Sequence, residues 1–141
     1  MTARSLSTSL EVEATTSRLS DVRRFVSAFA SEAGFSVKEV GEIVLAVDEA
    51  FTNIIRHAYT DTHGSIRMEI EVLNHRLTVS LFDTGTPFSP EISVRPNVST
   101  MIKEKKKGGM GVFLIHKMMD KVEYIQHKTK NEVRMVKFQS S

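Results

Sequence analysis

The stretch from Leu45 to Tyr59 constrains the fold of this chain most, because its apolar residues repeat with the period of an α-helix. They recur every three or four residues and mark the side of a helix that faces a core. On another stripe, Glu49 and Asn53 are four residues apart, so they lie about 40° apart around the helix and one turn along it. The predicted core-facing side consists of Val40, Val44, Val47, Phe51, Ile54 and Ala58.

The stripe that carries Glu49 and Asn53 has two interpretations. A carboxylate beside a neutral oxygen ligand can activate a hydroxyl group while a hard cation such as Mg²⁺ is held next to it. Alternatively, these two residues form a solvated helix face together with Glu42 and His57. For this helix taken alone we favour the solvated face, because short motifs often match by chance.

Two further segments follow in the chain. The run from Leu77 to Gly85 alternates as a strand does and ends in Asp83-x-Gly85. Later, Gly109 and Gly111 open an apolar helix. Taken singly, an Asp-x-Gly after a strand is more often a turn than part of a binding site. Glycines before a helix are about as often a flexible hinge as a phosphate-binding motif.

In this order the three segments make the chain resemble the GHKL nucleotide-binding superfamily, which includes gyrase, the Hsp90 chaperones, histidine kinases and MutL. Within it the sequence is most similar to the stand-alone serine-kinase anti-sigma factors of bacterial stress and sporulation control. The matching motifs are the N box at residues 48–53, continuing to 57–59; the Asp83-x-Gly85 box, with Pro87 and Phe88 after it; and the Gly109-x-Gly111 box. The likeness covers about residues 15–139.

Capping and turn signals outline the elements. We expect Ser17 to cap a helix through Glu32 that Gly34 ends, and Ser36 with Glu39 to form a capping box on the next helix. The expected strands are an edge strand at residues 5–13, a strand from Gly64, a strand from the turn at Asn74-His75 to Asp83, and a terminal hairpin of residues 121–128 and 132–138 around Lys130-Asn131.

These elements predict an α/β (α+β) two-layer sandwich, with a mainly antiparallel, mixed sheet of about five strands and three helices on one face. The resemblance implies the same architecture, the GHKL or Bergerat ATP-binding fold. We expect residues 1–141 to form a single such domain.

The resemblance also implies roles for individual residues. Glu49 is the expected catalytic residue, a general base that accepts the proton of a serine or threonine hydroxyl. Asn53 is the expected Mg²⁺ ligand and part of the ATP site, with phosphate oxygens and waters completing the metal shell. Asp83 is expected to accept a hydrogen bond from the exocyclic amine of adenine, which would reject guanine.

The glycines belong to the same expected ATP site. Gly85 would let the base pack against the backbone, and Gly109 and Gly111 lie where free backbone N–H groups at a helix start favour a polyphosphate. Residues 86–107, with a charge run at Lys103–Lys107, are expected to form an ATP lid; the alternative for this run is a solvated, mobile stretch. Lys130-Asn131-Glu132 stands where several relatives carry a glycine-threonine pair near adenine, which puts that secondary contact in doubt.

The function that the resemblance implies is an ATP-dependent serine/threonine protein kinase in a partner-switching circuit. It would sequester a sigma factor as an anti-sigma factor, and phosphorylate an anti-anti-sigma (STAS-type) protein. Arg23, on the helix at residues 17–32, is expected to face an acidic patch on either partner, and the protein is expected to be a homodimer. The alternative is a nucleotide-binding switch that binds partners without phosphotransfer.

The composition of the chain argues against several other classes of protein. The net charge of +2 is too small to argue for nucleic acid, and the chain lacks aromatic platforms and a recognition motif for it. There is no cysteine, which excludes disulfides and thiolate metal sites. No apolar run approaches the roughly 20 residues of a spanning helix, so no membrane partner and a cytoplasmic location are expected.

Overall fold

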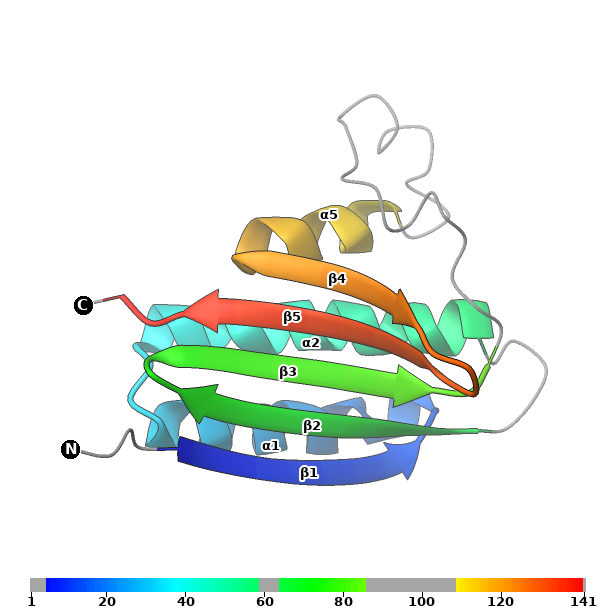
Figure 1. The fold of residues 1–141 in the computed structure, drawn as a ribbon, viewed down its shortest axis with the longest axis horizontal. Helices are drawn as coiled ribbons and strands as arrows, with labels where there is room; N and C mark the ends of the chain where they lie inside the picture. Colours follow the sequence, from blue (N-terminus) through cyan, green and yellow to red (C-terminus); the bar gives the residue numbers. More distant parts are fainter. Residues whose placement is uncertain (1–4, 59–63, 86–108, 141) are drawn as a thin grey trace.

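Five antiparallel strands in the order β1-β2-β3-β5-β4 form the sheet of the computed structural model, which describes residues 5–58, 64–85 and 109–140 (Figure 1). Three α-helices cover one face of this sheet within the described part of the chain (Figure 1). The strands are β1 (Ser5–Glu13), β2 (Ser65–Leu73), β3 (Arg76–Asp83), β4 (Lys121–Gln126) and β5 (Asn131–Phe138). The helices are the 3₁₀ turn η1 (Thr16–Arg18), α1 (Leu19–Glu32), α2 (Val37–Ala58) and α5 (Gly109–Met118).

The predicted two-layer architecture is confirmed, and β1 is the edge strand that the sequence indicated. Every strand pair in the described residues is antiparallel, so the sheet is not mixed there. Short hairpins join β2 to β3 and β4 to β5, and a short hairpin can only return antiparallel, which accounts for two of the four pairs.

The two hairpin turns differ in how well the sequence places them. Asn74 and His75 turn β2 into β3 as predicted, with positive φ values of 53° and 63° that suit a type I′ turn. The second turn lies earlier than predicted, where His127 N donates to the carbonyl of Lys130 at 2.8 Å. Asn131 is already the first residue of β5, because it pairs in register with Asp83 of β3.

Apolar side chains between the sheet and the helices form the core. In β2 the residues Ile66, Met68, Ile70 and Val72 are buried, and the residues between them point to the other, exposed face. Along α2 the predicted core residues are buried at Val40, Val47, Phe51 and Ile54, while Val44 is half-buried. The side chain of Ala58 lies outside the described residues.

The helix starts follow the capping signals at α2 but not at α1. Glu39 N donates to Ser36 Oγ at 3.1 Å and Ser36 N donates to Glu39 Oε1 at 3.0 Å, which confirms the capping box. Ser17 does not cap α1, because η1 comes first and α1 begins at Leu19 without a side-chain cap. Gly34 follows α1 with φ of +96°, as expected for a glycine after a helix.

The C-terminal tail returns to the start of α2. Oε2 of Glu39 accepts hydrogen bonds from Ser140 N at 2.8 Å and from Ser140 Oγ at 2.9 Å. The backbone N–H groups of Ser36 and Ser140 hold the pKa of Glu39 down to about 2. An ionised carboxylate therefore ties the end of the chain to α2.

None of the helices in the described residues is long and apolar enough to cross a membrane.

Candidate functional site

The first turn of α5 packs directly against the Glu49 stripe of α2. A β-carbon at Gly111 would lie 2.6 Å from Oε2 of Glu49 and 3.7 Å from Oδ1 of Asn53. No real β-carbon comes as close to another atom as that first distance, so only glycine fits without a shift of Glu49. Two of the three sequence motifs are thus in contact.

The stripe on α2 is not a solvated face. Asn53 is only 5% exposed and Glu49 is half-buried. Glu42, two turns before Glu49, forms an ion pair with the buried Lys137 of β5 (3.1 Å). The solvated-face interpretation is therefore wrong for these three residues, since α5 and β5 cover this side of the helix. The side chain of His57 lies outside the described residues.

Asp83 is the most enclosed carboxylate of the candidate site. It is 2% exposed at the end of β3, and its Oδ1 accepts a hydrogen bond from Gly85 N at 3.0 Å. Burial raises the pKa of Asp83, and the hydrogen bonds from Asn131 and Gly85 oppose that rise. The other oxygen, Oδ2, is buried and has no hydrogen-bond partner among the described residues. Buried acceptors without partners are rare, so Oδ2 needs a donor that the described residues do not supply.

Asn131 belongs to this site, although the sequence interpretation gave it no role. Its Nδ2 donates to Oδ1 of Asp83 at 3.0 Å and to the carbonyl of Gly85 at 3.1 Å. The register of β3 against β5 places Asn131 directly opposite Asp83. The resemblance marked residues 130–132 as a place near adenine, but the contact of Asn131 with Asp83 follows only from the pairing register.

The motif residues gather at one end of the molecule. The last residues of α2, the end of β3, the start of β5 and the start of α5 all lie toward the same side in Figure 1. Gly109 is the first residue of α5. Tyr59 and the predicted lid at residues 86–107 lie outside the described residues. Within the described ranges, no group of three histidine, aspartate or glutamate side chains is arranged to hold a metal ion.

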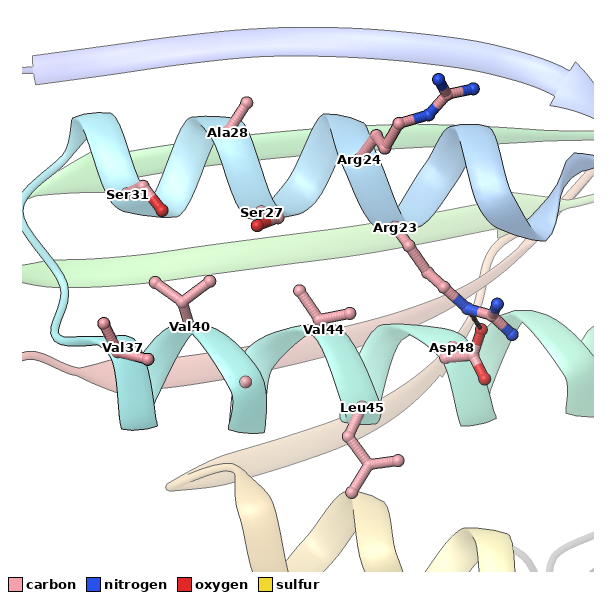
Figure 2. Close-up of a pocket in the computed structure, with 11 residues that line it drawn as sticks. Arg23, Arg24, Ser27, Ala28, Ser31, Val37, Val40, Val44, Leu45 and Asp48 are labelled. Carbon is pink, nitrogen blue, oxygen red and sulfur yellow. Dashed lines mark hydrogen bonds and ion pairs between the residues drawn. The ribbon is translucent and has the colours of Figure 1, made fainter.

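Arg23, the predicted partner-binding residue, lies apart from the glycine and aspartate motifs, on α1. Its Nε donates to Oδ1 of Asp48 on α2 at 2.6 Å, and this hydrogen bond raises the pKa of the guanidinium. Figure 2 shows the pair at one end of a groove of about 740 Å³ between α1 and α2, with Val40 and Val44 pointing into it. The Arg23 side chain remains 49% exposed. The sequence interpretation did not foresee Asp48 as its partner.

Comparison with known proteins gives a consistent set of relatives. A family profile described as "Histidine kinase-like ATPase domain" matches residues 12–137. The chain is 36% identical over 106 residues to the serine-protein kinase RsbW of Halalkalibacterium halodurans, covering 72% of this chain and 65% of that protein, just under two thirds of its length. It is 32% identical over 118 residues to the anti-sigma F factor of Caldanaerobacter subterraneus subsp. tengcongensis, covering 82% of each chain.

Two solved structures share the fold. The structure of the RsbU and RsbW domains of a Mycobacterium tuberculosis protein matches with a TM-score of 0.67 at 16% identity, covering 95% of this chain and 33% of that one. The Acinetobacter baumannii histidine kinase AdeS matches with a TM-score of 0.51 at 14% identity, covering 72% of this chain and 48% of that one. At these identities the likeness concerns the fold alone.

Proposed function

Because the chain belongs to the histidine kinase-like ATPase domain family, we propose that it is an ATP-dependent serine/threonine protein kinase that also acts as an anti-sigma factor. It sequesters a sigma factor, and it phosphorylates an anti-anti-sigma protein of the STAS type. The names of the relatives, serine-protein kinase and anti-sigma F factor, support both halves of this proposal.

The contact of Gly111 with Glu49 and Asn53 is the observation that carries the proposal. It brings a proton acceptor, a neutral oxygen ligand and the backbone of a helix start to one place. Free N–H groups at a helix start bind phosphate oxygens, and a glycine there lets them approach closely. These are the parts that phosphoryl transfer requires near the terminal phosphate.

The adenine end of the site is Asp83. Its buried Oδ2 accepts a hydrogen bond from the exocyclic amine of adenine, and a carboxylate is a strong acceptor for it. Guanine carries a carbonyl oxygen at that position, which would meet the carboxylate oxygen without a proton between them. Gly85 leaves room for the base beside the backbone, because it has no side chain.

At the phosphate end, Asn53 offers its side-chain oxygen to Mg²⁺, and Gly109 and Gly111 offer backbone N–H groups to phosphate oxygens. When bound, ATP would supply the phosphoryl group and Mg²⁺ would neutralise the charge that develops on it. Glu49 accepts the proton of the attacking serine or threonine hydroxyl of the protein substrate. Gly111 leaves room for the Glu49 carboxylate beside the start of α5, because glycine has no β-carbon that would displace it.

Arg23 is the proposed contact for the acidic surface of either partner, in a homodimer of this chain. Its hydrogen bond to Asp48 uses Nε, so the two Nη groups of the half-exposed guanidinium remain at the mouth of the groove (Figure 2). An arginine fork can pair with a carboxylate through these two groups. Its place beside a groove with apolar side chains is typical of an interface anchor.

A phosphotransfer assay with radiolabelled ATP, Mg²⁺ and a STAS-type protein from the source cell tests the proposal. The wild type should label one serine or threonine of that protein, and labelling should release it from the kinase. We expect Glu49→Gln to bind ATP normally and to lose transfer by about 10²-fold or more, whereas Asn53→Ala should weaken the Mg²⁺-dependent part of ATP binding.

If the wild type binds ATP and both partners but labels neither of them, the proposed kinase activity is contradicted. The function that then remains is a nucleotide-dependent binding switch. Wild-type rates in Glu49→Gln would show that another group is the base.

A further inference from the structure

A buried lysine connects β5 to both helices that carry the catalytic motifs. The Lys137 side chain is only 11% exposed and points from β5 into the helix layer. Its Nζ donates to Oε1 of Glu42 on α2 at 3.1 Å and to the carbonyl oxygen of Met118 at 2.7 Å. Met118 is the last residue of α5. One ammonium group therefore contacts α2 and α5 at the same time.

Both contacts of the Lys137 ammonium use groups that a cation stabilises. The carbonyl of Met118 is among the last four of α5, which have no partner within the helix, and the negative end of the helix dipole lies there. Glu42 supplies the opposite charge that a buried ammonium group requires. The ammonium thus satisfies the C-terminal end of α5 and ties it to α2.

The contacts of Lys137 lie two helical turns from the contact between Gly111 and Glu49, on both α2 and α5. Glu42 and Glu49 are seven residues apart on α2, and Gly111 and Met118 are seven residues apart on α5. At 1.5 Å per residue both separations are about 10.5 Å. The helices therefore run antiparallel, with Gly111 against Glu49 at one end and Met118 tied to Glu42 through Lys137 at the other.

We propose that Lys137 is a positioning residue for the nucleotide site, acting with Glu42 to fix where α5 lies along α2. This inference rests on the proposed function. Because Gly111 is in closest contact with Glu49, a small slide or rotation of α5 changes that contact at once. The backbone N–H groups at the start of α5 would then no longer face the place where Glu49 and Asn53 meet the phosphates.

Variants of the pair test this role by titration calorimetry with Mg²⁺-ATP. Lys137→Met keeps the length of the side chain without its charge, and Glu42→Leu removes the acceptor; each should weaken ATP binding by about tenfold. Glu42→Gln keeps an acceptor oxygen for Lys137 but not the charge, so its ATP affinity should lie between those of the wild type and Glu42→Leu. The double variant Lys137→Met/Glu42→Leu should be no worse than either single one, because both remove the same interaction.

Glu39→Ala is the matched control. It cuts the tie between Ser140 and the start of α2, so it destabilises the fold through α2 without touching α5. Amide hydrogen exchange of residues 109–118 in the nucleotide-free protein gives a second readout. We expect faster exchange there in Lys137→Met and Glu42→Leu than in Glu39→Ala.

Two results would overturn the inference. One is a folded Lys137→Met or Glu42→Leu protein with wild-type ATP affinity and wild-type exchange in α5. The other is an ATP affinity that follows the free energy of unfolding equally in all variants, Glu39→Ala included. A wild type that binds no ATP would instead contradict the proposed function, so the two failures are distinguishable.

Discussion

The side-chain amide of Asn131 determines which oxygen of Asp83 is left for a ligand. Nδ2 of Asn131 donates to Oδ1 of Asp83 at 3.0 Å, and Gly85 N donates to the same oxygen at 3.0 Å. Nδ2 also donates to the carbonyl of Gly85 at 3.1 Å, so both of its hydrogens are used. Oδ2 of Asp83 therefore remains the free acceptor among the described residues.

This arrangement predicts the effect of Asp83→Asn. The two donors that face Oδ1 would hold the new amide oxygen in that position, so its NH₂ group would replace Oδ2. A donor would then meet the amine of adenine, and we expect ATP affinity to fall by about 2–3 kcal/mol, or roughly 30–150-fold. Calorimetry with ATP and GTP checks this, since GTP affinity should not fall with it. Unchanged ATP affinity in a folded variant would make Asp83 a turn residue only.

Gly111→Ala should separate stability from catalysis. The new β-carbon collides with the far end of the Glu49 side chain, which can swing away, so we expect the protein to stay folded. The displaced carboxylate should lower phosphotransfer about tenfold or more, because a base must be within hydrogen-bond reach of its proton.

The control for this variant is Gly41→Ala on α2. A β-carbon at Gly41 would meet nothing within 4 Å, so the change should raise the free energy of unfolding by up to about 1 kcal/mol, with normal ATP affinity. Normal phosphotransfer by Gly111→Ala would mean that the position of Glu49 does not matter.

Arg23→Ala should weaken binding of the sigma factor or its antagonist by about fivefold or more, with ATP affinity and the dimer unchanged. The reason is that the half-exposed guanidinium offers donors to a carboxylate of the partner. Arg18→Ala is the matched control, because Arg18 lies directly before the same helix, its side chain is similarly exposed at 45%, and it is not among the residues that line the groove. Calorimetry of both variants measures their affinity for the partner and for ATP, and sedimentation measures whether they remain dimers. Normal binding by Arg23→Ala, or a monomeric wild type at micromolar concentration, contradicts the assignment.

The free energy of unfolding should depend on pH through Glu39. Its pKa is about 2 in the folded protein, below the ordinary value of 4.5, so the folded state binds the proton more weakly than the unfolded chain does. The stability it contributes is therefore complete above about pH 4.5 and is lost as the pH falls toward 2. We expect Glu39→Gln to reduce the free energy of unfolding by about 1 kcal/mol at pH 7, and by much less at pH 2.5.

Urea unfolding of both proteins at the two pH values checks this, because other carboxylates cancel in the difference. An equal difference at both pH values would contradict it.

The fold follows from the sequence where local chemistry decides it. The period-2 alternation of β2, the Asn74-His75 turn and the capping box at Ser36 each depend on residues close together in the chain, and each is confirmed. The start of α1 does not follow, since a 3₁₀ turn competes for the residues around Ser17.

The contacts of the site that the sequence did not indicate are those between residues distant in the chain. Asn131 meets Asp83 across the register of β3 and β5, and Lys137 meets Glu42 across 95 residues. No local pattern marks either pair. Motif spacing did place Glu49, Asn53 and Gly111 in one region, because the resemblance supplies the distant partner that periodicity lacks.

Asp48 and Glu49 are consecutive residues of α2 that serve different neighbours. Asp48 reaches across the groove to Arg23 on α1, and Glu49 lies against Gly111 on α5. Successive residues of a helix differ by about 100° in direction, so one peptide unit separates the two sides. The ion-pair partner of Arg23 and the proposed base are therefore carried by adjacent peptide units of one helix, on two different sides of it.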